Sequence, residues 1–184
     1  TSLTGNRYPQ SVDAYKEAVR AQYGELADEV LKAYPADSNE DVRDAYFALY
    51  RDRAFGWQMR TWARMMDTVE SKAYLSYFTP TPSRPDKDVS GAYHAAEIIY
   101  AFGNLSKTPY PNLQEDFRVS ERMMRYWLNF AETGDPNGEG LAEWPAYDAE
   151  TEPYMEFGDG AGVGHHLLQD KVDVLEQVFA AQRK

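Results

Sequence analysis

One short segment of this 184-residue sequence strongly favours a β-strand, and it stands among several segments with helical patterns. Residues Ala73–Phe78 are rich in the aromatic side chains that favour strands, and the next four residues include two prolines, which cannot continue a hydrogen-bonded ladder. A lone strand would leave both of its edges unpaired. The sequence therefore predicts that this chain needs strands from elsewhere to complete a sheet.

Most of the remaining pattern indicates amphipathic helices, because apolar side chains recur at intervals of three or four residues. We expect residues 11–34 to form two helices divided at Gly24, and a further helix to begin at the capping signal of Ser38 and Asp41. The other predicted elements are a helix over Arg51–Met66 with a break near Gly56, a helix over Leu113–Thr133 closed by Gly134, a short strand over Tyr154–Phe157, and a last helix marked by Val172, Leu175, Val178 and Phe179.

The charge balance of the chain argues against several classes of function. Its 30 acidic residues outnumber 19 basic ones, and the resulting net charge of -11 repels phosphate backbones, so nucleic acid is not an expected partner. No stretch approaches the roughly 20 apolar residues of a membrane helix, so no membrane association is expected. Cysteine is absent, which excludes disulfides and thiolate sites within this sequence.

Histidine is the side chain that acts as a base near neutral pH, and three histidines occur here: His94, His165 and His166. His94 lies in Gly91–Glu97, after a proline-rich loop (residues 80–90) that follows the best strand. The α/β hydrolases place a catalytic histidine at such a position. Without further context, however, a lone histidine beside apolar residues is more often structural than catalytic.

The rest of the sequence offers one weaker candidate site and lacks several common catalytic motifs. His165 and His166 follow a glycine-rich segment and have no suitably spaced third ligand, so we interpret them as part of a solvated loop rather than a metal site. The sequence also contains no Gly-x-Ser-x-Gly elbow, no phosphate-binding Gly-x-x-x-x-Gly-Lys and no Gly-x-Gly-x-x-Gly. The chain by itself is therefore not expected to form an acyl-enzyme.

Several segments, in order, resemble the type-B carboxylesterases, which include bacterial para-nitrobenzyl-type esterases and the animal cholinesterases. Residues 91–105, Gly-Ala-Tyr-His-Ala-Ala-Glu-Ile-Ile-Tyr-Ala-Phe-Gly-Asn-Leu, are similar to the histidine segment of that family. Residues 125–137 resemble the helix and turn that follow it, and Trp144–Tyr147 and Tyr154–Met155 continue the match. Upstream, residues 52–60 resemble a segment that lines the substrate gorge in bacterial members. The resemblance favours a bacterial esterase.

The resemblance implies a fold class, and it implies that this chain carries only one residue of the catalytic triad. The chain is expected to be α/β: the C-terminal part of an α/β-hydrolase fold, mostly helical, with a few strands that complete a sheet supplied by the N-terminal part. Residues 1–184 would form one segment of a single catalytic domain rather than an independent domain. The family's triad runs Ser, Glu, His along the chain, so His94 would be its base, and Thr1 is expected to lie shortly after the missing glutamate.

The same resemblance assigns roles to other residues. Glu97 is expected to order the histidine loop, although its alternative role is a capping or buried carboxylate. Phe55, Trp57 and Met59 are candidates for the apolar wall of the substrate pocket, and their alternative role is ordinary core packing. The implied partners are a small-molecule ester and the N-terminal portion of the same esterase, which carries the serine and the acidic residue. No cofactor is implied.

Two other classes of function stay open at this point. One is a cholinesterase-like protein that has lost catalysis and acts as a binding or adhesion module, against which the presence of His94 argues. The other is an independent helical interaction domain, which would leave the Gly-Ala-Tyr-His segment and the lone strand unexplained. The cellular location is not determined by these residues, although the resemblance favours a secreted or periplasmic enzyme.

Overall fold

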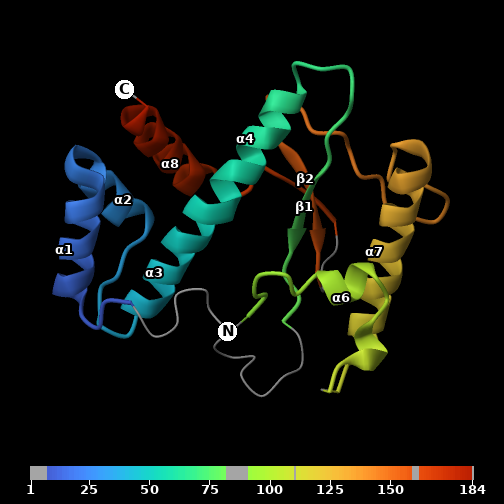
Figure 1. Cartoon of the computed structure of the whole chain (residues 1–184), viewed down its shortest axis with the longest axis horizontal. Coiled ribbons are helices and arrows are strands. Elements are labelled where there is room, and N and C mark those ends of the chain that lie inside the picture. Colours follow the sequence, from blue (N-terminus) through green and yellow to red (C-terminus); the bar gives the residue numbers. More distant parts are fainter. Residues whose placement is uncertain (1–7, 82–90, 110, 159–161, 184) are drawn as a thin grey trace. The chain divides into compact units, whose positions relative to one another are not determined.

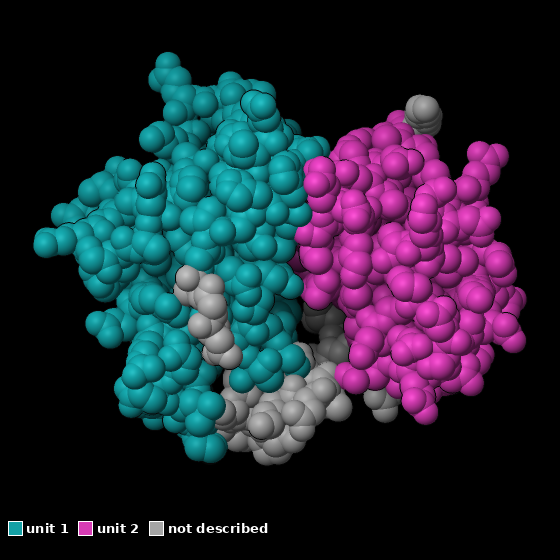
Figure 2. Space-filling view, turned by 180° about the vertical axis from the view of Figure 1, so that it is seen from behind, with its two compact units in different colours: residues 1–3, 63–167 teal, residues 4–62, 168–184 magenta. Residues whose placement is uncertain are grey.

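The computed structural model describes residues 8–81, 91–109, 111–158 and 162–183. These residues fall into two units (Figure 2): a sheet unit within residues 63–167, and a helical unit within residues 8–62 and 168–183. The boundary between the units lies inside helix α4 (Trp57–Met66). No helix of the described residues is long and apolar enough to cross a membrane.

The helical unit is built from short amphipathic helices that bury one apolar face each (Figure 1). Its core includes the fully buried side chains of Tyr15, Val30, Val42 and Leu175. In chain order its elements are α1 (Val12–Tyr23), the 3₁₀ turn η1 (Gly24–Leu26), α2 (Ala27–Ala33), α3 (Val42–Arg51), the π-helical turn η2 (Asp52–Gly56), the start of α4, and α8 (Gln169–Gln182).

Local signals explain most of these boundaries. Ser11 caps α1 by accepting a hydrogen bond from the Ala14 amide at 3.2 Å. Gly24 ends α1 with φ 54°, a conformation that glycine adopts without steric cost, so the predicted division of residues 11–34 is confirmed. The predicted helix after Ser38 and Asp41 is confirmed as α3, but Ser38 does not cap it. Ser38 does donate its amide and hydroxyl to Asp41, but these bonds close a turn, and α3 begins only at Val42.

The sheet unit contains a three-stranded sheet with helices beside it (Figure 1). Strand β1 (Leu75–Phe78) pairs in parallel with β2 (Pro153–Phe157), which pairs antiparallel with β3 (Gly162–His165), so β2 is the central strand. The helical elements are α6 (Ile98–Ala101), the 3₁₀ turn η3 (Leu105–Lys107) and α7 (Gln114–Thr133). The prediction of a mostly helical chain with a few strands is confirmed.

The strand β3 corrects part of the interpretation of the glycine-rich segment before His165 as a loop: residues 162–164 belong to a strand, whereas residues 159–161 lie outside the described residues. Gly164 lies opposite Tyr154 in the register of β2 and β3, and the Tyr154 ring lies directly against its backbone. A Cβ atom at Gly164 would lie 2.3 Å from Tyr154 Cζ, so any larger residue there would require the Tyr154 ring to shift. Glycine ordinarily weakens strands, and it is kept where another group approaches the backbone closely. That contact is not visible in the local sequence pattern.

Aromatic side chains dominate the core of the sheet unit. Trp144 lies in edge-on or tilted contact with the rings of Tyr74, Tyr126, Trp127 and Phe157, at centroid distances of 5.4 to 5.9 Å. Such offset arrangements stabilise beyond the area that they bury. The other buried members of this core are Tyr100, Leu105, Val119, Met123 and Met155.

Candidate functional site

His94 lies in a tight turn that leads into α6, and its side chain is exposed. The Ala96 amide donates a hydrogen bond to the Tyr93 carbonyl at 3.0 Å, so His94 and Ala95 are the two central residues of this turn. The first part of the predicted loop, residues 80 and 81, is described, whereas residues 82–90 lie outside the described residues. The structure therefore describes the turn itself and the residues that connect it to α6.

Ala95 adopts a left-handed backbone conformation, with φ 67°. A positive φ at the third position of a turn ordinarily calls for glycine, because the Cβ atom of other residues clashes there. Such strain costs on the order of 1 to 3 kcal/mol and persists only where the surrounding structure imposes it. The strained residue follows His94 directly. Nothing in the sequence around Ala95 indicates this strain.

Residues that follow the turn attach it to the core. Ala96 and Tyr100 are buried, at 1 % and 0 % exposure. Glu97 directly precedes α6, and its carbonyl accepts hydrogen bonds from the Tyr100 amide at 3.0 Å and the Ala101 amide at 2.9 Å. Burial raises the pKa of the Tyr100 hydroxyl, and its hydrogen bond to Asp116 raises that pKa further. The phenol therefore stays protonated and donates to the Asp116 carboxylate.

The three predicted pocket residues lie in the helical unit, on the stretch where α3 passes into α4. Phe55 is half-buried in the π-helical turn η2, a rare element that often occurs at functional sites. The Trp57 ring stacks on Phe179 at 3.9 Å, and its Nε1 donates to Glu176 at 2.6 Å. Met59 is 39 % exposed. His94 belongs to the other unit, so the assignment of these residues to one pocket with it stays a prediction.

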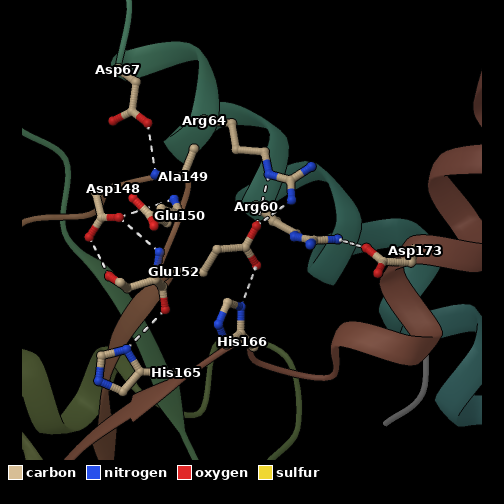
Figure 3. A network of polar contacts seen from close by, with 11 residues as sticks. Arg60, Arg64, Asp67, Asp148, Ala149, Glu150, Glu152, His165, His166 and Asp173 are labelled. Atoms are coloured by element: carbon tan, nitrogen blue, oxygen red, sulfur yellow. Dashed lines mark hydrogen bonds and ion pairs between the residues drawn. The ribbon is translucent and has the colours of Figure 1, made fainter.

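A second polar cluster in the sheet unit surrounds Glu152, which is 3 % exposed and was not singled out from the sequence (Figure 3). Its Oε1 accepts hydrogen bonds from Nε of Arg64 at 2.9 Å and from Nη2 of the same side chain. Its Oε2 lies 3.9 Å from Nδ1 of His166, and its carbonyl accepts the His166 amide at 3.1 Å. Glu152 and His166 both have positive φ, at 42° and 54°.

This cluster corrects the interpretation of the histidine pair as a solvated loop. His165 is the last residue of β3, with its Nδ1 2.9 Å from the Thr151 carbonyl. Nδ1 of His166 is buried and has no hydrogen-bond partner among the described residues. In the same view, the ion pair of Arg60 with Asp173 lies within the helical unit. The Glu152 cluster joins α4 to the ends of β2 and β3, which is a structural function.

Metal binding finds no support in these clusters. Among the residues that the structure describes, no three histidine, aspartate or glutamate side chains lie close enough together to hold a metal ion. The chemistry that the described part of the chain offers is that of an exposed imidazole on a strained, well-anchored turn.

Comparisons with known proteins identify relatives of this chain. The sequence profile of the Carboxylesterase family matches residues 3–175. The chain is 33 % identical over 149 residues to Carboxylesterase 5A of Canis lupus familiaris, which covers 76 % of the chain and 26 % of that protein. It is 33 % identical over 155 residues to Liver carboxylesterase of Sus scrofa, with 80 % and 27 % covered. It is 39 % identical over 149 residues to Liver carboxylesterase 1 of Mus musculus, with 77 % and 25 % covered.

Two consequences follow from these relatives. The chain spans about a quarter of the length of the curated proteins that it matches. The expectation of a bacterial esterase is not supported, because these relatives are mammalian.

Proposed function

Because the chain belongs to the carboxylesterase family, as its motifs predicted, we propose that it supplies His94 as the base of a Ser-Glu-His triad that hydrolyses carboxylic esters. The serine and the glutamate would lie in a further segment of the polypeptide, since these 184 residues contain no Gly-x-Ser-x-Gly elbow. The assembled enzyme, as the term is used below, is this chain together with that segment. The observation that carries the proposal is the strained turn at Ala95, which presents an exposed His94 within the family's histidine segment.

In the assembled enzyme, His94 would take the proton of the serine hydroxyl as its oxygen attacks the ester carbonyl. It would then return that proton to the departing alcohol, and the same cycle with water would release the acid. The glutamate would hold the imidazole in the required tautomer and stabilise its charged form, and backbone amides outside this chain would bind the oxyanion. This chemistry requires no cofactor.

The described sheet supports completion by the further segment. Strand β1, which precedes the His94 loop, is an edge strand among the described residues, with β2 on one side. An open edge of this kind is a template for pairing with another strand. Large apolar side chains are also exposed, among them Trp62, Phe102 and Leu128 at 64 %, 73 % and 68 %. On this proposal residues 1–184 form one part of an α/β-hydrolase catalytic domain whose remaining sheet strands pair at β1.

The remaining site residues receive supporting roles. Glu97 would order the His94 turn, because it lies three residues after the histidine and directly precedes α6. Phe55, Trp57 and Met59 would contribute apolar surface toward a small-molecule ester, the surface by which such ligands are mostly recognised. Trp57 is held by Phe179 and Glu176, so it would be a rigid part of that wall.

The proposal is tested by steady-state kinetics of His94→Ala in the assembled enzyme with a chromogenic ester. We expect kcat to fall by about 10⁴-fold or more, because loss of the base disables the triad as a unit. His165→Ala is the matched control, since His165 is also exposed and lies at the end of β3. It should retain kcat within about twofold of the parent. Full turnover by a folded His94→Ala enzyme would contradict the proposal.

A further inference from the structure

We propose that Tyr100 and Asp116 are positioning residues that hold the strained turn of His94 in its catalytic orientation. This inference rests on the proposed role of His94 and adds a device that lies outside the triad itself. It is carried by a buried hydrogen-bonded connection between α6, which follows the turn, and α7, which is a long and well-packed helix.

The connection between α6 and α7 consists of two short hydrogen bonds. The Tyr100 hydroxyl donates to Oδ1 of Asp116 at 2.6 Å, and the Ser120 hydroxyl donates to the Tyr100 carbonyl at 2.7 Å. All three residues are buried. Hydrogen bonds to a charged, buried carboxylate are about twice as strong as neutral ones. Tyr100 is therefore held at both its side chain and its backbone.

Asp116 serves two elements at once. Its Oδ2 accepts a hydrogen bond from the Leu113 amide at 2.6 Å and so caps the first turn of α7, while its Oδ1 holds Tyr100. α7 has 20 residues and buries Val119, Met123 and Tyr126 in the aromatic core. The carboxylate is thus fixed by a rigid element, and Tyr100 is fixed through it.

Tyr100 is also in contact with the end of the strand that precedes the histidine loop. Its ring meets the ring of Phe78, the last residue of β1, at a centroid distance of 5.0 Å and an interplanar angle of 66°. The residues on both sides of the His94 loop therefore meet at one tyrosine. This contact ties the residues that follow the His94 turn to the end of β1.

The connection matters because α6 cannot hold the turn by itself. α6 has four residues, and a single helical turn is marginal without tertiary support. Hydrogen bonds run from the Ile98 amide to the Ala95 carbonyl at 3.3 Å and from the Tyr100 amide to the Glu97 carbonyl at 3.0 Å. They transmit the position of Tyr100 to Ala95. If Tyr100 were released, Ala95 could relax to an ordinary conformation and turn the His94 imidazole away.

The test measures kcat and KM for Tyr100→Phe in the assembled enzyme. Tyr126→Phe is the matched control, because Tyr126 is equally buried in the sheet unit and donates its hydroxyl to the Ala142 carbonyl at 2.7 Å. We expect kcat of Tyr100→Phe to fall by about 10- to 100-fold with KM little changed, since small displacements of a reacting group have effects of this size. Tyr126→Phe should stay within about twofold of the parent.

A second pair of variants distinguishes positioning from loss of stability. Adding Ala95→Gly to Tyr100→Phe should restore part of the lost kcat, because glycine adopts a positive φ without strain and needs less restraint. Ser120→Ala, a milder change, should lower kcat in the same direction even if Tyr100→Phe folds poorly. Because kcat is expressed per folded enzyme, measured by circular dichroism, a residue that contributed only to stability would show no loss for glycine at position 95 to restore.

The outcomes separate this inference from the function on which it rests. If His94→Ala keeps its turnover, the proposed function fails, and the positioning role fails with it. If His94→Ala is inactive while Tyr100→Phe and Ser120→Ala lose no more kcat than Tyr126→Phe, only the positioning role is contradicted. A loss specific to Tyr100→Phe and Ser120→Ala, with rescue by Ala95→Gly, supports it.

Discussion

The two units of this chain are stabilised in different ways. The helical unit depends on apolar packing: Tyr15, Val30, Val42 and Leu175 are fully buried, and Ser11 caps the start of α1. The sheet unit contains three of the four non-glycine residues with positive φ in the described chain, Ala95, Glu152 and His166. Each of the three is adjacent to a buried polar contact or to the proposed catalytic residue.

The difference between the two units shows which kind of contact accompanies a strained backbone conformation. Residues in unfavourable conformations persist only when several contacts determine them at once. In the sheet unit these contacts are polar and at least partly buried: Tyr100 with Asp116 near the His94 turn, and Arg64 with Glu152 at the β2 and β3 ends. The helical unit has a buried carboxylate too, Asp52, which accepts a hydrogen bond from Tyr34 at 3.2 Å and begins the π-helical turn η2 without a positive φ.

The largest effect is expected from removing apolar volume in the helical unit. Leu175→Ala should lower the free energy of unfolding by about 3 to 4 kcal/mol, because a fully buried leucine loses both its transfer energy and its packing. Hydrogen–deuterium exchange of the assembled enzyme should place the loss of protection first in α1, α2 and α8. Equal loss in β1 and β2 would mean that the two units are not stabilised separately.

An intermediate effect is expected from the buried ion pair of the sheet unit. Arg64→Ala leaves the Glu152 carboxylate buried without its guanidinium partner, at a cost of about 2 to 3 kcal/mol, below that of a fully buried pair because the Arg64 side chain is 38 % exposed. Arg118→Ala is the control, because the pair of Arg118 with Glu115 is exposed and should be worth less than about 1 kcal/mol. Urea denaturation measures the loss of stability in both variants. Equal losses would mean that the Arg64–Glu152 pair does not stabilise the strained backbone of the sheet unit.

The smallest effect compares one substitution in the two units. Ala18→Gly, at an exposed position in the middle of α1, should cost roughly 0.5 to 1 kcal/mol, because glycine lowers helix propensity. Ala95→Gly should be neutral or stabilising, because relief of the positive φ offsets the greater freedom of the unfolded chain. Thermal melts of the two variants give the difference. A loss at Ala95 as large as that at Ala18 would contradict the strained turn.

The sequence predicted elements wherever the signal is local. The division at Gly24, the strand β1, the long helix α7 with its end at Gly134, and the strand β2 were all found from periodicity and terminating residues. The fold class could be predicted to the extent of a mostly helical chain with a few strands. Family resemblance, rather than periodicity, selected His94 from the three histidines.

What the sequence did not reveal depends on contacts between distant residues. Gly164 in β3 has the ring of Tyr154 against its backbone, a contact across two strands that the periodicity of the sequence does not show. Arg64 and Glu152 are 88 residues apart, and neither stands in a recognisable motif. The strain at Ala95 is likewise imposed from outside the turn, through Tyr100 and Asp116. Such features become visible only once the chain has folded.

The central claim is that His94 activates a serine that lies outside these 184 residues. The most direct measurement is intact mass spectrometry of the assembled enzyme after treatment with a fluorophosphonate, which labels activated serines. The account predicts that the parent enzyme gains one probe mass on the segment outside this chain, and that His94→Ala gains none over the same time. Equal labelling of both enzymes would contradict the claim.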